Sequence, residues 1–249
     1  MRLPQFNYHS PDTLEGVLAL LDQHRDQTGI LAGGTDLLVR MKHRLARPKG
    51  LVSLKHLDSL SGIEETSGMV GIGARTPIIQ VIRSERLRDL VPALGQACER
   101  IGAVSIQHFR GTIGGNILQD NRCIHYNQSV FHRSGHQPCH KAGGKICYAR
   151  DESDRCNATC QSDGACALMA LDAQLTLVST RGERQMALDT FYTTDGIKPF
   201  DMQPDELLTR IDIPVIPGVV SAYERLSYRS AIDYPIVCAG VRLVPEPGD

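Results

Sequence analysis

The sequence predicts an α+β fold with a small α/β unit, a larger unit of mixed sheet and helices, and a short third region. Three observations support this prediction. A strand, a glycine turn, a helix and another strand follow one another in residues 1–60, an order typical of a small parallel sheet. Strand patterns and amphipathic helices follow from about residue 63. Hydrophobic periodicity then largely disappears between residues 116 and 162, which indicates a long functional loop.

The first unit, residues 1–60, begins with a helix over residues 13–24. Its apolar residues recur at helical spacing, and a capping residue with a proline precedes them. The apolar run 29–32 predicts a buried strand that ends in a glycine turn. We expect a helix over residues 37–42 and a strand over 50–54.

The second unit, residues 61–215, opens with a strand over residues 69–74 and contains the unpatterned insertion at about 117–161. Further helices are expected over residues 76–82, 92–101 and 165–173, and further strands over 174–179 and 207–214. The third region, residues 216–249, contains a strand predicted at 223–229 and a strand-like run before residues 241–245.

The overall charge excludes several classes of partner. The net charge is −1, and basic and acidic residues are interspersed, so no basic stripe is available to follow a nucleic acid. No apolar run is long enough to span a bilayer, and the first residues lack the apolar core of a signal peptide. We therefore expect a cytoplasmic protein in which the eight cysteines are metal ligands or buried thiols rather than disulfides.

Two glycine turns are candidate anion-binding sites. The first is Ala32-Gly33-Gly34-Thr35-Asp36 and the second is Thr112-Ile113-Gly114-Gly115-Asn116. Glycine lets backbone N–H groups approach an anion closely, and a helix starting after the turn favours negative charge. Each turn alone is also explained as a simple tight turn, and the dinucleotide fingerprint GxGxxG is absent. Both turns together suggest a nucleotide-like cofactor.

Four cysteines lie in the unpatterned insertion, at Cys123, Cys139, Cys147 and Cys156. Thiolates favour iron–sulfur clusters, zinc or copper(I), and the spacing alone does not choose among them. Four histidines of the same loop keep a zinc site open as an alternative, namely His125, His132, His136 and His140. Cys160 and Cys166 follow closely and leave the C-terminal ligand ambiguous. Cys98 and Cys238 are expected to be small buried hydrophobic residues.

These motifs carry a resemblance to a known family. The segment 31–38, together with residues 112–116, resembles the paired FAD motifs of the medium subunits of xanthine-oxidase-type molybdenum hydroxylases, and the resemblance extends over nearly the whole chain. It implies the PCMH-type FAD-binding fold. The segments at 119–123, 126–129, 133–135 and 153–156 resemble the iron–sulfur insertion in the beta subunits of 4-hydroxybenzoyl-CoA reductases. This second resemblance implies a [4Fe–4S] cluster on Cys123, Cys139, Cys147 and Cys156.

The resemblance also implies which residues contact FAD. They are Ile30, Leu31, Ala32, Gly33, Gly34, Thr35, Asp36, Leu37, Gly102, Gly111, Thr112, Ile113, Gly114, Gly115, Asn116, Asp163, Leu208 and Arg225. Asp163 has an alternative role as the N-cap of the following helix. Arg225 stands where some relatives have lysine and could stabilise an anionic reduced flavin, or it could be a solvated surface residue.

The function implied by the resemblance is electron transfer. This chain would pass electrons from ferredoxin through its cluster and FAD to a small [2Fe–2S] subunit and a large molybdenum subunit, in a dimer of heterotrimers. Substrate would react on the large subunit, so we expect no general acid or base here. Relatives continue beyond residue 243, so residues 216–249 would begin a C-terminal flavoprotein domain. The alternatives are the FAD subunit of another such hydroxylase, a standalone FAD oxidoreductase, and a zinc-stabilised interaction module.

Overall fold

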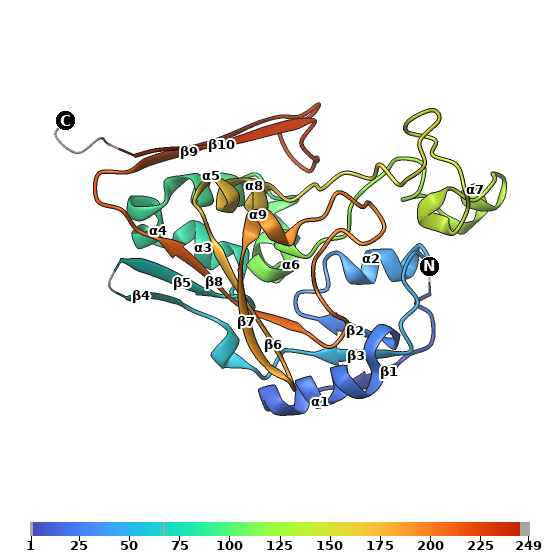
Figure 1. Cartoon of the computed structure of the whole chain (residues 1–249), viewed down its shortest axis with the longest axis horizontal. Coiled ribbons are helices and arrows are strands. Elements are labelled where there is room, and N and C mark those ends of the chain that lie inside the picture. Colours follow the sequence, from blue (N-terminus) through green and yellow to red (C-terminus); the bar gives the residue numbers. More distant parts are fainter. Residues whose placement is uncertain (1, 67, 245–249) are drawn as a thin grey trace.

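The computed structural model describes residues 2–66 and 68–244 and contains three sheets. A three-stranded parallel sheet has the order β1-β3-β2, and a five-stranded sheet has the order β4-β5-β8-β6-β7, with every neighbouring pair antiparallel. Strands β9 and β10 form a separate hairpin (Figure 1). Both sheets and helices are therefore present, which confirms the α+β prediction.

The N-terminal unit contains the predicted parallel sheet. Its strands are β1 (Asn7–His9), β2 (Thr28–Leu31) and β3 (Gly50–Ser53), and its helices are α1 (Leu14–His24) and α2 (Leu37–Lys42). Thr13 begins α1, because its hydroxyl oxygen accepts a hydrogen bond from the Gly16 N–H at 3.1 Å. The apolar face of α1 buries Val17 and Leu21 in one cluster with Val52. This packing fixes the end of β2, where the first glycine turn begins.

The larger unit packs helices against the five-stranded sheet. Its strands are β4 (Ile63–Thr66), β5 (Met69–Gly73), β6 (Gln174–Ser179), β7 (Gly182–Ala187) and β8 (Leu207–Pro214). Its helices are α3 (Ile78–Arg83), α4 (Glu85–Leu90), α5 (Pro92–Glu99), α6 (Ile113–Ile117), α8 (Asp163–Ala170) and α9 (Leu188–Phe191). The main core lies between the two layers and includes Ile72, Leu94, Leu168 and Ile211, all of which are fully buried.

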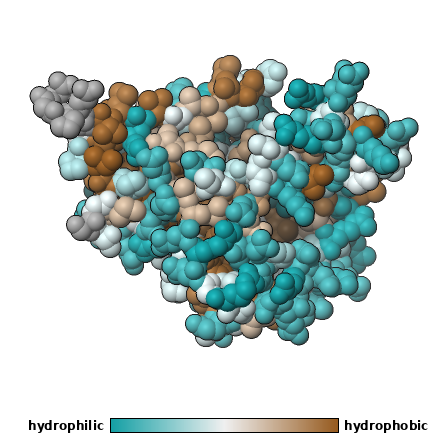
Figure 2. Space-filling model, viewed as in Figure 1, coloured by the Kyte–Doolittle hydropathy of each residue, from teal (hydrophilic) through white to brown (hydrophobic). Residues whose placement is uncertain are grey.

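The terminal hairpin, β9 (Val220–Leu226) and β10 (Val237–Leu243), packs on α5 and α8 (Figure 1). Its approach to α8 is close, because a Cβ at Gly240 would lie 2.9 Å from the Cys166 carbonyl oxygen. Apolar residues of the hairpin remain exposed, and Figure 2 shows apolar surface over this region. The strand predicted at 223–229 in fact ends at Leu226, where the Ser227 hydroxyl donates to the Arg229 carbonyl and the chain turns.

The cysteine segment, residues 117–161, has little regular structure, as its sequence predicts. It contains the short helix α7 (Val130–Ser134) and a 3-10 turn at His140–Ala142, and it lies at one end of the molecule (Figure 1). Reciprocal backbone hydrogen bonds between Arg122 and Thr159, at 2.9 and 3.0 Å, close its base. The segment is thus a loop fastened at its two ends.

Across residues 2–66 and 68–244, no helix has the length and apolar character needed to cross a membrane.

Candidate functional site

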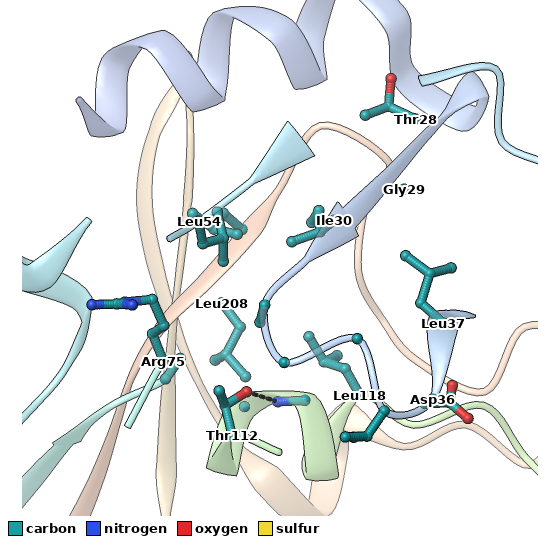
Figure 3. A pocket seen from close by; sticks show the side chains of 18 of the residues that line it. Thr28, Gly29, Ile30, Asp36, Leu37, Leu54, Arg75, Thr112, Leu118 and Leu208 are labelled. Carbon is teal, nitrogen blue, oxygen red and sulfur yellow. Dashed lines mark hydrogen bonds between the residues drawn. The ribbon is translucent and has the colours of Figure 1, made fainter. Parts of the chain in front are cut away.

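The two predicted glycine turns line one cleft of about 530 Å³, a volume typical of small-molecule and cofactor sites. The turn after β2 runs close to the start of α6, where Thr112 lies, and Leu54 and Leu208 line the same space (Figure 3). Eleven of the residues implied for FAD line this cleft: Ile30, Ala32, Gly33, Gly34, Thr35, Asp36, Leu37, Thr112, Gly114, Gly115 and Leu208. The fold therefore joins two motifs that are distant in the sequence.

Glycine is required where the two turns meet. A Cβ at Gly33 would lie 1.7 Å from the Arg110 carbonyl oxygen, and a Cβ at Gly114 would lie 2.7 Å from the Ala74 carbonyl oxygen. Gly34 has φ +74°, a conformation that side chains disfavour. The turns thus pack backbone against backbone, which leaves main-chain walls along the cleft and fits an elongated ligand with a diphosphate group.

Charged and capping groups complete the cleft. The Thr112 hydroxyl oxygen accepts a hydrogen bond from the Gly115 N–H at 3.1 Å and so begins α6. Arg40, Arg47 and Arg75 also line the cleft, and their positive charge suits an anionic ligand. Sequence patterns did not identify Arg47 or Arg75, because neither lies in a glycine turn. Phe200 and Met202 were also missed; they reach the cleft from a loop without periodicity.

Seven of the residues implied for FAD lie outside the cleft lining: Leu31, Gly102, Gly111, Ile113, Asn116, Asp163 and Arg225. Asn116 joins α6 to α8, because its side-chain oxygen accepts from the Ser162 hydroxyl at 2.8 Å and from the Gly164 N–H at 3.1 Å. Gly111 permits a tight approach, since a Cβ there would lie 2.5 Å from the Gln107 carbonyl oxygen. In this structure, the direct contacts of Asn116 and Gly111 are with the protein itself.

Asp163 and Arg225 form a buried ion pair. Arg225 Nη1 donates to Asp163 Oδ1 at 3.1 Å, and the two side chains are 2% and 5% exposed. The alternative of a solvated surface arginine is therefore wrong. The alternative of Asp163 as an N-cap is also wrong, because the Ser162 hydroxyl accepts from the Ala165 N–H and fills that position. The Tyr223 hydroxyl donates to Asp163 at 2.6 Å, and burial, followed by this hydrogen bond, raises the pKa of Tyr223.

The four cysteines of the insertion line one small cavity, together with His125, His140 and Lys141. They are Cys123, Cys139, Cys147 and Cys156. Cys160 and Cys166 do not line it. Burial raises the pKa of Cys156, and the charges of Cys139 and Cys123 act in the same direction, whereas Lys141 opposes them.

The cavity lining supplies four thiols as candidate metal ligands. Within residues 2–66 and 68–244, no three His, Cys, Asp or Glu side chains are grouped closely enough to hold one metal ion. A zinc ion needs its ligands within about 2.3 Å of one centre. In a four-iron cluster each thiolate binds a different iron, so the sulfurs lie farther apart around a shared space. Four cysteines line the cavity, the number of thiolates that either a zinc ion or a four-iron cluster binds.

The remaining cysteines differ from one another. Cys98 is fully buried in the main core, which confirms its prediction as a small hydrophobic residue. Cys238 is only partly buried and faces Cys166, so the prediction of a simple core residue is wrong for this position. The close packing of β10 on α8 brings these two thiols together.

Comparisons with known proteins agree with the cleft. A family model described as the FAD binding domain in molybdopterin dehydrogenase matches residues 4–216. The nicotinate dehydrogenase FAD-subunit of Eubacterium barkeri is 28% identical over 243 residues, covering 96% of this chain and 69% of that protein. The carbon monoxide dehydrogenase medium chain of Afipia carboxidovorans is 30% identical over 244 residues, covering 98% and 70%.

Solved structures show the same fold. A carbon monoxide dehydrogenase from Hydrogenophaga pseudoflava, in a form lacking the Mo-pyranopterin moiety, matches with a TM-score of 0.77 and 26% identity over 100% of this chain and 72% of that chain. Quinoline 2-oxidoreductase from Pseudomonas putida 86 matches with a TM-score of 0.75 and 22% identity, covering 100% and 72%, and supports the fold alone.

The fold and the cleft define a flavin-nucleotide-binding oxidoreductase subunit. The chain belongs to the family of FAD-binding domains in molybdopterin dehydrogenases, since the family model matches most of its length. This membership overrules the alternative of a zinc-stabilised interaction module. The chain spans about two thirds of the length of the curated relatives it matches.

Proposed function

We propose that this chain is the electron-transfer flavoprotein subunit of a molybdenum enzyme, with FAD in the cleft and a [4Fe–4S] cluster on Cys123, Cys139, Cys147 and Cys156. The proposed cluster is supported by the fact that these four cysteines, spread along an unpatterned loop, line one cavity. The proposed FAD site is supported by the cleft that both glycine turns line, in a member of an FAD-binding family.

The chain's own residues would bind and orient these groups. The glycine turns would bring backbone N–H groups against the diphosphate, and Arg40 and Arg47 would offset its charge. Leu208, Phe200 and Met202 would supply apolar contacts that exclude water from the bound ring system. When bound, FAD would exchange one or two electrons and the cluster one at a time, which is the chemistry of a redox relay.

We further propose 4-hydroxybenzoyl-CoA reductase as the parent enzyme. The support is the resemblance of the segments around Cys123 and Cys156 to the iron–sulfur insertion of those beta subunits. The partners would then be a large molybdenum subunit, where the phenolic hydroxyl is removed, and a small [2Fe–2S] subunit, in a dimer of heterotrimers. Ferredoxin would donate electrons at the cysteine segment. We propose a division of the chain into units 1–60, 61–215 and 216–249.

A second candidate is the FAD subunit of another hydroxylase of the xanthine dehydrogenase type. The matches to subunits named for nicotinate, carbon monoxide and xanthine dehydrogenases favour it. Anaerobic purification of the native complex, with cofactor analysis of every subunit, separates the two. Dehydroxylation of 4-hydroxybenzoyl-CoA with reduced ferredoxin supports the first candidate, and hydroxylation of another substrate without that activity contradicts it.

The cofactors are tested on the isolated chain. We expect the chain, treated anaerobically with iron, sulfide and FAD, to show flavin bands together with broad iron–sulfur absorption. Cys139→Ser should lose iron and sulfide but still bind FAD at saturating FAD concentration, because Cys139 lines only the cysteine cavity. Cys160→Ser is the matched control and should keep both, since Cys160 is exposed and outside that cavity. A colourless protein with one zinc per chain would overturn the cluster.

A further inference from the structure

A network of five charged side chains lies between the cleft and the cysteine cavity. Its members are Asp36, Arg40, Asp120, Arg122 and Lys141. Arg40 contacts Asp36 at 3.8 Å and Asp120 at 3.3 Å, and Arg122 pairs with Asp36. Lys141 Nζ lies 2.8 Å from Asp120 Oδ1. Asp36 and Arg40 line the cleft, whereas Lys141 lines the cysteine cavity, so the network reaches both sites.

Lys141 is the most buried cation of this network, with 6% of its side chain exposed. Its ammonium group donates to Asp120 Oδ1 at 2.8 Å, to the Gly196 carbonyl at 2.8 Å and to the Asn121 carbonyl at 3.2 Å. An ammonium has three donors, and each has an acceptor here. Lysine is rarely buried unless it is paired in this way. The surroundings are therefore built to hold a positive charge at this point.

The contacts of Lys141 join separate segments of the chain. Lys141 lies in the middle of the cysteine segment, Asp120 and Asn121 lie at its start just after α6, and Gly196 belongs to the loop before β8. Asp120 in turn holds Arg40, which follows the first glycine turn on α2. Movement of Lys141 would therefore be transmitted to the cleft through the ion pairs Lys141–Asp120 and Asp120–Arg40.

The charges of the network suit two anionic neighbours. Two carboxylates and three cations leave one net positive charge between the cleft and the cavity. A diphosphate in the cleft and a cluster held by four thiolates would both be negative, and would repel each other without an intervening cation. Lys141 lies on the cavity side of this network, and Arg40 lies on the cleft side.

We infer that Lys141 is a positioning residue that couples the two sites, so that filling the cysteine cavity strengthens FAD binding in the cleft and the reverse. Through Asp120 it orders Arg40 at the cleft while it holds the cysteine segment in place. This inference rests on the proposed function for the identity of the two ligands. Coupling of this kind is reciprocal and typically amounts to a change of about 5- to 150-fold in affinity.

The experiment compares FAD dissociation constants of the cluster-loaded and cluster-free chain by fluorescence titration. We expect FAD to bind at least about fivefold tighter to the loaded wild-type chain, the lower end of typical coupling. In Lys141→Met, the FAD dissociation constants of the cluster-loaded and cluster-free chain should be equal. Asp120→Asn is the second variant: its amide oxygen can still accept from Lys141, but the charge that holds Arg40 is gone. Lys145→Met is the matched control, because Lys145 is exposed in the same segment, and it should keep the full difference.

A second readout needs no cluster. FAD added to the cluster-free wild-type chain should slow hydrogen exchange at the Ala142 amide, which bonds the Cys139 carbonyl beside Lys141, and Lys141→Met should abolish this protection. Equal dissociation constants in the two wild-type forms, or a full difference retained in both Lys141→Met and Asp120→Asn, would overturn the coupling. Failure of FAD to bind at all, or of iron to load, would instead contradict the proposed function.

Discussion

Arg225 Nη1 donates to both carboxylate oxygens of Asp163, at 3.1 and 3.2 Å, in a pair that is almost wholly buried. Arg225 lies on β9 and Asp163 is the first residue of α8. The Tyr223 hydroxyl donates to the same carboxylate at 2.6 Å. The pair therefore fastens the terminal hairpin to the helix that follows the cysteine segment. Its desolvation is offset only while both charges are present.

Arg225→Met should destabilise the chain strongly. The substitution leaves the buried Asp163 carboxylate without its cation, and breaking a buried pair in this way costs about 3–5 kcal/mol. The free energy of unfolding, measured in urea, reports the change. Asp163→Asn combined with Arg225→Met should recover part of the loss, because neither charge then remains buried.

The matched control for this substitution is Arg100→Met. Arg100 also pairs across to the hairpin, with Glu224 at 3.4 Å, but both side chains are well exposed. Exposed pairs contribute about 0–1 kcal/mol, so this change should be small. Equal losses of unfolding free energy in Arg225→Met and Arg100→Met would show that burial of the Asp163–Arg225 pair does not increase its contribution to stability.

Gly33→Ala should separate the two glycine turns. The new Cβ would lie 1.7 Å from the Arg110 carbonyl oxygen, which is backbone and cannot rotate away. We expect unfolding to become easier by about 1–3 kcal/mol, as for overpacked sites. FAD affinity, measured by flavin fluorescence, should fall by at least about tenfold, the equivalent of 1.4 kcal/mol.

Gly95→Ala is the control for Gly33→Ala. Gly95 lies inside α5, and nothing stands within 4 Å of the Cβ that it would gain. Alanine is favoured over glycine in a helix by about 1 kcal/mol, so this variant should be neutral or slightly more stable. Unchanged FAD binding in Gly33→Ala would mean that the close approach of the turns does not shape the cleft.

Local patterns in the sequence predicted the parts of the fold that depend on interactions between residues close in the sequence. Helical spacing located α1 and α2, and β6 and β8 were expected at the residues where they occur. The two glycine turns were identifiable because the backbone geometry there excludes a side chain. Their meeting in one cleft followed from the family resemblance rather than from the residues alone.

Pairs formed by residues far apart in the sequence could not be predicted from local patterns. Strand β7 (Gly182–Ala187) is mostly polar and exposed, and is held by its pairing with β6 rather than by an apolar pattern. Burial of Arg225 depends on Asp163, which lies far away in the sequence, so charge alone indicated a surface residue. Lys141 was missed for the same reason, because its acceptors come from two places distant from it in the sequence, residues 120–121 and Gly196. Such pairs become visible only when the fold brings them together.

The last prediction concerns the thiols of Cys166 and Cys238, which contact each other where β10 packs on α8. A hydrogen bond from the Cys166 thiol lowers the pKa of Cys238, and Arg225 acts in the same direction, whereas burial and Asp163 oppose them. Cys238 is therefore the thiol of the pair that ionises first. Since the thiolate is the reactive form, Cys238 should be alkylated at neutral pH faster than an ordinary thiol of equal exposure.

Cys166→Ala removes the donor, so the pKa of Cys238 should rise and its alkylation profile should move to higher pH. Loss of a hydrogen bond worth about 1 kcal/mol corresponds to a rise of about 0.7 in the pKa of Cys238, so the midpoint of its alkylation profile should move up by about 0.7 pH unit. Iodoacetamide labelling followed by peptide mass spectrometry measures Cys238 separately from the other cysteines. Cys147→Ser should leave the profile in place, because Cys147 is not among the groups that shift the pKa of Cys238. A faster Cys238 in Cys166→Ala would show that Cys166 shields this thiol rather than activating it.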